Sequence, residues 1–229
     1  MSLLRREKRP PVEPADWRDV TTFTIGSTER PPTKGYRRPV DGPTAIRVTD
    51  EDAYGPILRP CAYLGSPQNN TGGPDIAHTL FTDPLHAHLL CSVSHRHEKD
   101  GIGHHVVRTA EGTRIGVIQR LPRKGLRRHT WRIEQPGRPV VVGRSRWATY
   151  SPRQFAGEAG ISLANVALDS VLPGEGKDTA APRRLTWTAD DELVMETQDR
   201  HPTHLHADWL DRRLAFAFAL IGDKDPIAL

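Results

Sequence analysis

The sequence lacks an apolar run long enough to cross a membrane as a helix. Its longest such run, LAFAFALI at residues 214–221, is eight residues long, whereas a membrane-spanning helix needs about 20. Five of the first eleven residues are charged and no apolar stretch follows them, so no secretory signal is expected. Cysteine is also scarce, since Cys61 and Cys91 are the two present among 229 residues. A disulfide-dense secreted scaffold is therefore excluded, and we expect reduced thiols in the cytoplasm, with a single disulfide as the alternative.

Familiar catalytic motifs are missing as well. The sequence contains no Gly-x-Ser-x-Gly nucleophile motif, no His-Glu-x-x-His zinc motif and no glycine-rich phosphate loop. The nearest approach to a cysteine–histidine pair is Cys91 with His95 and His97, and a buried cysteine is far more often an ordinary core residue. We therefore expect a binding or scaffold protein rather than an enzyme, and no cofactor.

Charge is distributed unevenly along the chain. Arginine outnumbers lysine by 26 to 6, a bias that a GC-rich bacterial genome produces and that recognition of phosphate or carboxylate would also favour. Residues 96–153 carry fourteen Lys/Arg and four Asp/Glu, a net charge of +10, whereas residues 154–229 carry seven and thirteen, a net charge of −6. The basic segment therefore either forms one face that attracts anions or pairs with the acidic last third of the chain.

The first 40 residues are rich in proline and in basic residues, with the runs RREKRPPVEP and ERPPTKGYRRP. Consecutive prolines favour an extended chain, so we predict a flexible basic arm over residues 1–40 and one β-barrel-like domain over residues 41–229. Within the arm, residues 20–25 (VTTFTI) are β-prone and could pair at a sheet edge. The arm is also the candidate contact for a protein partner.

Most of the remaining chain consists of short β-prone segments separated by turn residues, whereas residues 55–75 have the composition of a loop. In one of these segments Trp131 and Ile133 alternate with polar residues, which is typical of a half-buried strand. Asp190 and Asp191 are the turn of a hairpin near the end of the chain. The predicted strands lie at residues 44–48, 85–93, 105–109, 114–120, 129–135, 138–143, 184–189 and 192–198.

The last predicted element is a helix over residues 209–221. Asp208 and Asp211 resemble a helix-capping pair, and Gly222 stands where a terminating glycine belongs. A helix that is apolar on all sides is surrounded by protein. A strand is the alternative, because alanine alternates with larger apolar residues. The side chains that we predict to be buried are Leu214, Phe216, Phe218 and Leu220.

Successive hairpins followed by an apolar helix predict a mainly β fold, an antiparallel barrel closed around a C-terminal apolar helix. Three segments in residues 105–229 carry a resemblance to a known family: AEGTRIGVIQR, HTWRIEQPGRPVVVG and DRRLAFAFALIGD. In these segments the chain resembles the tubby C-terminal-like superfamily, which includes LURP-one-related proteins and phospholipid scramblases. The resemblance implies a twelve-stranded barrel around a central hydrophobic helix, and a function in binding phosphoinositides or acting at membranes. The lysine/arginine pair of the tubby phosphoinositide site has no counterpart here that can be matched residue by residue.

Eleven histidines occur, several of them in His-x-His pairs. Residues i and i+2 of a strand lie on the same face, so such a pair can offer two imidazoles to one metal ion. Lys99 stands where a metallo-hydrolase pattern requires aspartate. We expect no bound metal, and an enzyme that uses residues 86–105, with or without a metal, is the alternative. The candidate metal ligands for that alternative are His86, His88, His95 and His97.

Four cations surround Gly125 in a predicted turn, and they are the predicted anion-binding residues: Arg123, Lys124, Arg127 and Arg128. They should be exposed, because so many charges cannot be desolvated together without partners. The expected contact is an anionic lipid or a phosphorylated ligand, and the alternative is a solvated turn that binds nothing.

Specific nucleic-acid binding is not expected. The predicted function is non-enzymatic binding of an anionic ligand or membrane surface, and a second alternative is a subunit of a larger assembly docked through the arm.

Overall fold

The computed structural model describes residues 10–65, 75–122, 130–145, 184–198 and 202–222. Within these ranges the chain is mainly β, and no helix there is both long and apolar enough to cross a bilayer. The elements are η1 (Trp17–Asp19), β1 (Thr22–Arg30), β2 (Val40–Asp52), β3 (Gly55–Leu64), β4 (Ile76–Phe81), β5 (Leu89–Ser94), β6 (His97–Lys99), β7 (Ile102–Arg108), β8 (Arg114–Leu121), β9 (Thr130–Glu134), β10 (Val141–Ser145), β11 (Arg184–Ala189), β12 (Glu192–Gln198), β13 (Thr203–Leu205) and α3 (Arg212–Ile221).

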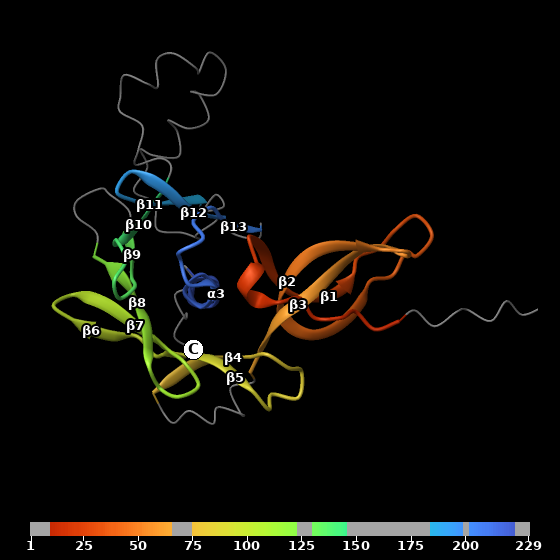
Figure 1. The fold of residues 1–229 in the computed structure, drawn as a ribbon, viewed down its shortest axis with the longest axis horizontal. Helices are drawn as coiled ribbons and strands as arrows, with labels where there is room; N and C mark the ends of the chain where they lie inside the picture. The colour runs from red at the N-terminus through yellow and green to blue at the C-terminus, as the bar shows by residue number, and fades with distance from the viewer. Residues whose placement is uncertain (1–9, 66–74, 123–129, 146–183, 199–201, 223–229) are drawn as a thin grey trace, which may run out of the picture.

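Twelve of these strands close into an antiparallel barrel (Figure 1). The neighbours around the ring are β5-β4-β3-β2-β1-β13-β12-β11-β10-β9-β8-β7, and a pairing between β5 and β7 closes it. This closing seam is short, with Ser92 in register with Arg108 and Val93 in register with Val107. The short strand β6 follows β5 along the chain and pairs with β7. The prediction of a mainly β, antiparallel barrel is confirmed.

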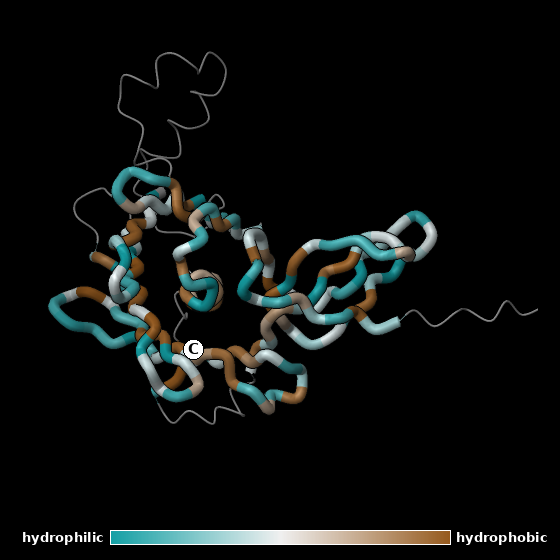
Figure 2. The backbone as a smooth tube through the Cα atoms, viewed as in Figure 1, coloured by the Kyte–Doolittle hydropathy of each residue, from teal (hydrophilic) through white to brown (hydrophobic). Residues whose placement is uncertain are grey.

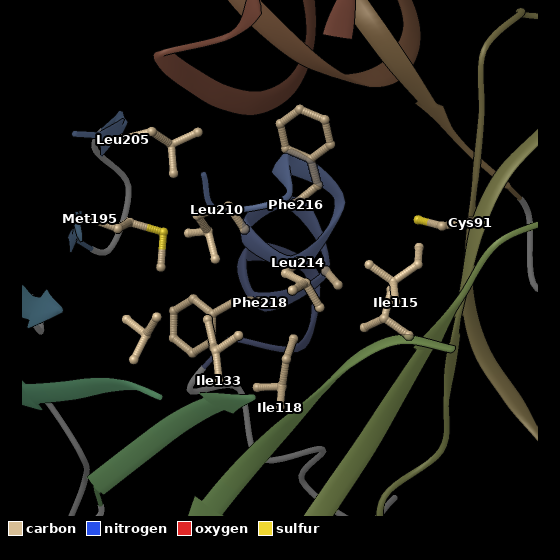
Figure 3. Packing of buried hydrophobic residues seen from close by; sticks show 14 of the residues in the cluster. Cys91, Ile115, Ile118, Ile133, Met195, Leu205, Leu210, Leu214, Phe216 and Phe218 are labelled. Atoms are coloured by element: carbon tan, nitrogen blue, oxygen red, sulfur yellow. The ribbon is translucent and has the colours of Figure 1, made fainter. Parts of the chain in front are cut away.

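The helix α3 lies inside the ring (Figure 1), and hydrophobic residues recur along the strands that surround it (Figure 2). Leu214 and Phe216 have no exposed surface, and Phe218 is 5% exposed. The ring of Phe218 contacts Trp131 and Trp187 edge-to-face, with centroid distances of 5.2 and 4.5 Å. Figure 3 shows these helix side chains among buried side chains of several strands. Such aromatic contacts bury large apolar surfaces and fix the orientation of the helix.

Two details of the predicted helix need correction. The helix begins at Arg212 rather than at residue 209, because Asp211 is its N-cap and accepts a hydrogen bond from the backbone N–H of Arg213 at 2.9 Å. Leu220 is half-buried rather than buried. The last turn of α3 is therefore less completely surrounded than the middle of the helix. The predicted end is correct, since the N–H of Gly222 donates to the carbonyl of Phe218 at 2.8 Å.

Most strands of the second half of the sequence agree with the prediction, but β10 begins at Val141 rather than at residue 138, and β13 was not predicted. The hairpin of β11 and β12 has the predicted bounds, and Asp190 and Asp191 turn the chain with φ values of 48° and 64°. Aspartate tolerates this left-handed conformation better than most residues do. The strands β7, β8, β9 and β10 pair in succession, as expected for the consecutive strands predicted between residues 105 and 143. Trp131 and Ile133 of β9 are buried, at 2% and 0% exposure.

Strand predictions in the first half of the sequence were partly wrong. Residues 55–64 form the ten-residue strand β3 rather than a loop. Its prolines argued against a strand, but Pro60 lies at an irregularity in the register with β2, where a missing N–H is tolerated. The strand predicted at residues 85–93 begins at Leu89, because Asp83 folds the preceding residues into a turn by accepting hydrogen bonds from three backbone N–H groups.

The predicted flexible arm also needs correction. Residues 22–30 form β1, which lies in the ring between β2 and β13. Residues 10–16 have no regular structure, yet they follow β3: the N–H of Ala15 donates to the carbonyl of Pro60 at 2.8 Å, and Arg59 donates to the carbonyls of Glu13 and Pro14. At least the second half of the segment is therefore part of the domain.

The strands β1, β2 and β3 extend beyond the ring as a three-stranded projection (Figure 1). We call this projection the wing and define it as residues 28–41 and 49–58. Its outer end holds the turn between β1 and β2 and the turn between β2 and β3. The two turns are adjacent, because Arg30 pairs with Asp52 at 2.7 Å across them.

Replacing Phe218 with alanine should lower the free energy of unfolding by about 3–5 kcal/mol, the usual scale for deleting a core aromatic ring. The measurement is equilibrium unfolding in denaturant. Leu85→Ala is the control, because Leu85 is 87% exposed and its loss should change stability by less than about 0.5 kcal/mol. Equal stability of the two variants would contradict the packing of α3 described above.

A truncated chain that starts at Val40 should lose cooperative unfolding. The truncation removes β1, so β2 and β13 each lose a neighbour and the ring is opened. Thermal unfolding followed by circular dichroism tests this, with a chain that starts at residue 10 as the control that keeps every described strand. A sharp transition in the shorter chain would show that β1 is dispensable.

Candidate functional site

The predicted anion-binding residues lie outside the described part of the chain. The strand β8 ends at Leu121 and β9 begins at Thr130. Arg123, Lys124, Arg127 and Arg128 fall between these two strands in the sequence. Their role as an anion-binding turn therefore stays a prediction.

The four candidate metal ligands are distributed over separate places. His86 stacks on Phe81 with ring centroids 4.7 Å apart, and His88 lies 3.3 Å from a carboxylate oxygen of Asp83. His97 lies 2.9 Å from a carboxylate oxygen of Asp75. In the part of the chain that the structure describes, no three histidine, cysteine, aspartate or glutamate side chains are placed to hold one metal ion.

His95 instead approaches two histidines that the sequence analysis did not select, His78 and His105. His78 on β4 is in register with Val93, and His105 on β7 is in register with Ile118. Val93 and Ile118 are fully buried, and residues in register share a face of the sheet. His78 and His105 therefore lie on the inner face of the barrel beside the closing seam, and each interacts electrostatically with His95.

Burial disfavours the charged form of these imidazoles. Desolvation lowers the pKa of His78, and repulsion by His95 lowers it further. Desolvation also lowers the pKa of His105; a hydrogen bond to the carbonyl of Ser94 opposes this shift, and Arg96 adds to it. Because a carbonyl oxygen accepts, the Nδ1 of His105, which lies 3.2 Å from it, carries the proton. His78 and His105 therefore favour the neutral imidazole.

Neither described cysteine is suited to be a nucleophile. Cys61 and Cys91 are free thiols and both are buried. Burial raises the pKa of each thiol to about 12. The reactive species is the thiolate, so the cysteine–histidine pairing of Cys91 with His95 considered from the sequence has no chemical support in the structure.

The outer face of β11, β12 and β13 holds a shallow pocket of about 160 Å³ around Glu196. One carboxylate oxygen of Glu196 lies 2.9 Å from Nη2 of Arg184, and the other lies 3.4 Å from Nε2 of His206. The hydrogen bond from Arg184 holds the pKa of Glu196 below its usual range. Both oxygens are thus engaged by side-chain nitrogens, and we assign this network to the stability of the outer face.

Carboxylates of the wing form ion pairs with arginines of β1, β2 and β3. Arg47, which has no exposed surface, donates to the carbonyls of Gly26, Leu58 and Pro43 and lies 3.6 Å from Glu29. Desolvation lowers the pKa of Arg47, and Glu29 opposes that shift. The carboxylates of Asp52 and Asp50 pair in the same way with Arg30 at 2.7 Å and Arg59 at 3.0 Å. These contacts fix the three strands relative to one another.

The outer end of the wing carries cations without such partners. Thr33 and Tyr36 exchange backbone hydrogen bonds of 2.8 and 3.1 Å, which places Lys34 at the tip of a tight turn. Lys34, Arg37 and Arg38 are exposed and have no ion-pair partner among the described residues. We call these three residues, together with Tyr36 and Tyr54, the wing tip.

Two tyrosines accompany the cations of the wing tip. Tyr36 is 44% exposed and Tyr54 is 42% exposed. The guanidinium of Arg30 lies 5.8 Å from the ring centroid of Tyr54, which ties that ring to the buried pair of Arg30 and Asp52. The wing tip is therefore a preorganised surface of exposed cations and half-exposed aromatic rings.

Sequence reasoning missed the wing tip because it treated the run ERPPTKGYRRP as part of a flexible arm. The available signal was the turn dipeptide Pro31-Pro32 followed by Gly35, between two β-prone segments. Comparison with known proteins adds no evidence, because no family model, no curated protein and no solved structure matches the chain.

The stability of the fold should fall as the pH drops below about 6.5, the ordinary pKa of histidine. The pKa values of His78 and His105 are lowered in the folded state, so the unfolded chain binds more protons than the folded chain in that range. Above about pH 6.5 both states are neutral at these positions and the effect vanishes. Urea unfolding at a series of pH values measures how steeply the free energy of unfolding changes with pH.

In the double variant His78→Gln/His105→Gln, the free energy of unfolding should depend less steeply on pH than in the natural chain. The difference should appear between pH 6.5 and the lowered pKa values of the two histidines. His88→Gln is the control for the loss of an imidazole, because the side chain of His88 is 79% exposed. An unchanged slope in the double variant would exclude these histidines as the cause.

Proposed function

We propose that the chain is a non-catalytic binding protein that attaches to anionic surfaces through its wing tip. The observation that carries the proposal is the contrast within the wing. Its carboxylates Glu29, Asp50 and Asp52 are paired with arginines, whereas the outermost cations are exposed and unpaired among the described residues. Exposed cations without internal partners create a positive local potential that attracts anions.

A membrane surface is the anionic partner that this geometry fits best. Lysine and arginine near an anionic bilayer each contribute about 1 kcal/mol. Tyrosine has an apolar body and a polar hydroxyl, so its side chain suits the boundary between headgroups and acyl chains. The wing projects from the barrel (Figure 1), so its tip can reach a flat surface without contact by the ring.

We further propose that the chain belongs with the tubby C-terminal-like proteins and resides in the cytoplasm. A closed barrel of twelve antiparallel strands around a C-terminal helix supports the first proposal. The two free thiols support the second, since they fit a reducing compartment. Neither proposal is needed for the membrane contact of the wing tip.

The membrane proposal is tested by co-sedimentation with phosphatidylcholine vesicles that contain or lack phosphatidylserine. The triple variant Lys34→Ala/Arg37→Ala/Arg38→Ala should bind the anionic vesicles about a hundredfold more weakly, the effect of losing three contacts of about 1 kcal/mol each. Binding of the natural chain should also weaken at high salt, because salt screens exposed charges. The matched control is Lys99→Ala/Arg114→Ala/Arg138→Ala, which removes three exposed cations elsewhere.

Further arms of the experiment identify the contact. Tyr36→Ser should weaken binding to anionic vesicles. It should leave unchanged the degree to which free inorganic phosphate inhibits that binding. If the variant with alanine at Arg123, Lys124, Arg127 and Arg128 loses binding while the wing-tip variant keeps it, the predicted turn is the contact and the wing tip is not. Equal binding by the two triple variants would contradict the proposal.

A further inference from the structure

A second exposed feature, separate from the wing tip, is the loop that joins β4 to β5. We call residues 82–88 the Leu85 loop. Leu85 is 87% exposed, whereas the other large apolar side chains on the described surface are at most 44% exposed. Pro84 and Ala87 beside it are exposed as well. A single exposed leucine is common on protein surfaces, so the structure of the loop around it decides what this one can do.

The loop is held in one conformation by Asp83. Its carboxylate accepts hydrogen bonds from the backbone N–H groups of Leu85, Ala87 and His88 at 3.0, 3.1 and 2.8 Å. Its backbone carbonyl accepts from the N–H of His86 at 3.2 Å. The loop is therefore preorganised, and a contact made by Leu85 requires little further ordering of the chain.

His86 anchors the loop on the barrel. Its φ of 59° lies in the left-handed region, which few residues other than glycine adopt. Its ring stacks on Phe81 with a centroid distance of 4.7 Å, and Phe81 packs in a small apolar cluster with Ala45 and Tyr63. The strained residue thus turns its ring onto the barrel, while Leu85, one position earlier, is left exposed.

The backbone of the loop tip needs no hydrogen-bond partner from outside. The N–H groups of residues 85–88 all donate to Asp83 within the loop, and Pro84 has no N–H. An N–H group without a partner is costly in an apolar environment, and the hydrocarbon region of a bilayer offers no partner. The loop tip can therefore leave water at a low cost, which favours a bilayer as the environment that Leu85 enters.

The Leu85 loop lies on the side of the ring from which the wing projects (Figure 1). It follows Phe81 of β4, which is in register with Tyr63 of β3, the strand whose first residues belong to the wing. The loop contains no lysine or arginine, so it offers apolar contact and no attraction to anions. The wing tip and the Leu85 loop thus differ in chemistry and lie on the same side of the barrel.

We propose that Leu85 inserts into the bilayer as an apolar anchor when the wing tip binds an anionic membrane surface. This inference rests on the membrane contact proposed for the wing tip. The anchor adds a contact that salt does not screen, because burial of an apolar side chain is not an electrostatic interaction. Two separate contacts also restrict how the barrel tilts on the membrane.

The first test is co-sedimentation of Leu85→Ala with phosphatidylcholine vesicles that contain phosphatidylserine. The variant should bind about tenfold more weakly, the scale of losing most of a buried leucine side chain, and the ratio to the natural chain should be the same at low and high salt. Leu193→Ala is the matched control, because it truncates a leucine of β12 that is 41% exposed. Equilibrium unfolding verifies that both variants keep the fold.

A fluorophore at the loop tip measures insertion directly. Cys61 and Cys91 are buried, so a thiol-reactive nitrobenzoxadiazole label attaches selectively to Leu85→Cys in the folded chain. Its emission should rise when the anionic vesicles are added and should be quenched by spin labels on the acyl chains. The same label on Leu193→Cys should not respond. The proposal is overturned if Leu85→Ala binds like the control, or if the label at residue 85 gives no response.

The wing-tip triple variant separates failure of the anchor from failure of the proposed function. If that variant loses binding while Leu85→Ala keeps it, the wing tip is the membrane contact and the anchor is wrong. If Leu85→Ala loses binding while the wing-tip variant keeps it, the anchor stands and the wing tip is wrong. Absence of vesicle binding by the natural chain overturns both and leaves an apolar pocket of a partner protein as the occupant for Leu85.

Discussion

The packing of α3 inside the ring is the contact on which the rest of the structure depends. Phe216 meets Phe23 of β1 edge-to-face at 4.9 Å, and Phe218 meets Trp187 of β11 at 4.5 Å, so one helix joins strands that lie far apart in the sequence. The helix lies so close to β8 that a Cβ at Gly116 would be 2.9 Å from a leucine methyl group of α3. Because the helix lies in the interior, the wing tip that we propose as a binding surface lies outside the ring.

Buried arginines determine which charges remain available at that surface. Arg47 of β2 and Arg212 at the start of α3 each donate to several backbone carbonyls. Burying a guanidinium is costly unless its donors are satisfied, and the nearby carboxylates compensate part of the charge. The side chains left over are those at the periphery, Lys34 and its neighbours at the wing tip.

The histidines show how sequence proximity and spatial proximity differ. His86 and His88 are two residues apart but make separate contacts, one with Phe81 and one with Asp83. His78, His95 and His105 are separated by ten or more residues in the sequence but influence one another electrostatically, because β4, β5 and β7 are neighbours in the ring. A His-x-His spacing indicates a shared face of a strand, but strand order and the closing seam decide which imidazoles meet.

The sequence by itself determined the elements whose patterns are local. The hairpin around Asp190 and Asp191, the inward face of Trp131 and Ile133, and the apolar helix that ends at Gly222 all follow from turn chemistry or from the spacing of apolar residues over a few positions. Only the tertiary structure decided that residues 22–30 belong to the ring and that residues 55–64 form a strand despite their prolines. It also decided that β5 pairs with β7, and that Lys34 and Tyr54 meet at one tip. These features depend on contacts between distant segments, and nothing within a short window of sequence records the partner that stabilises each of them.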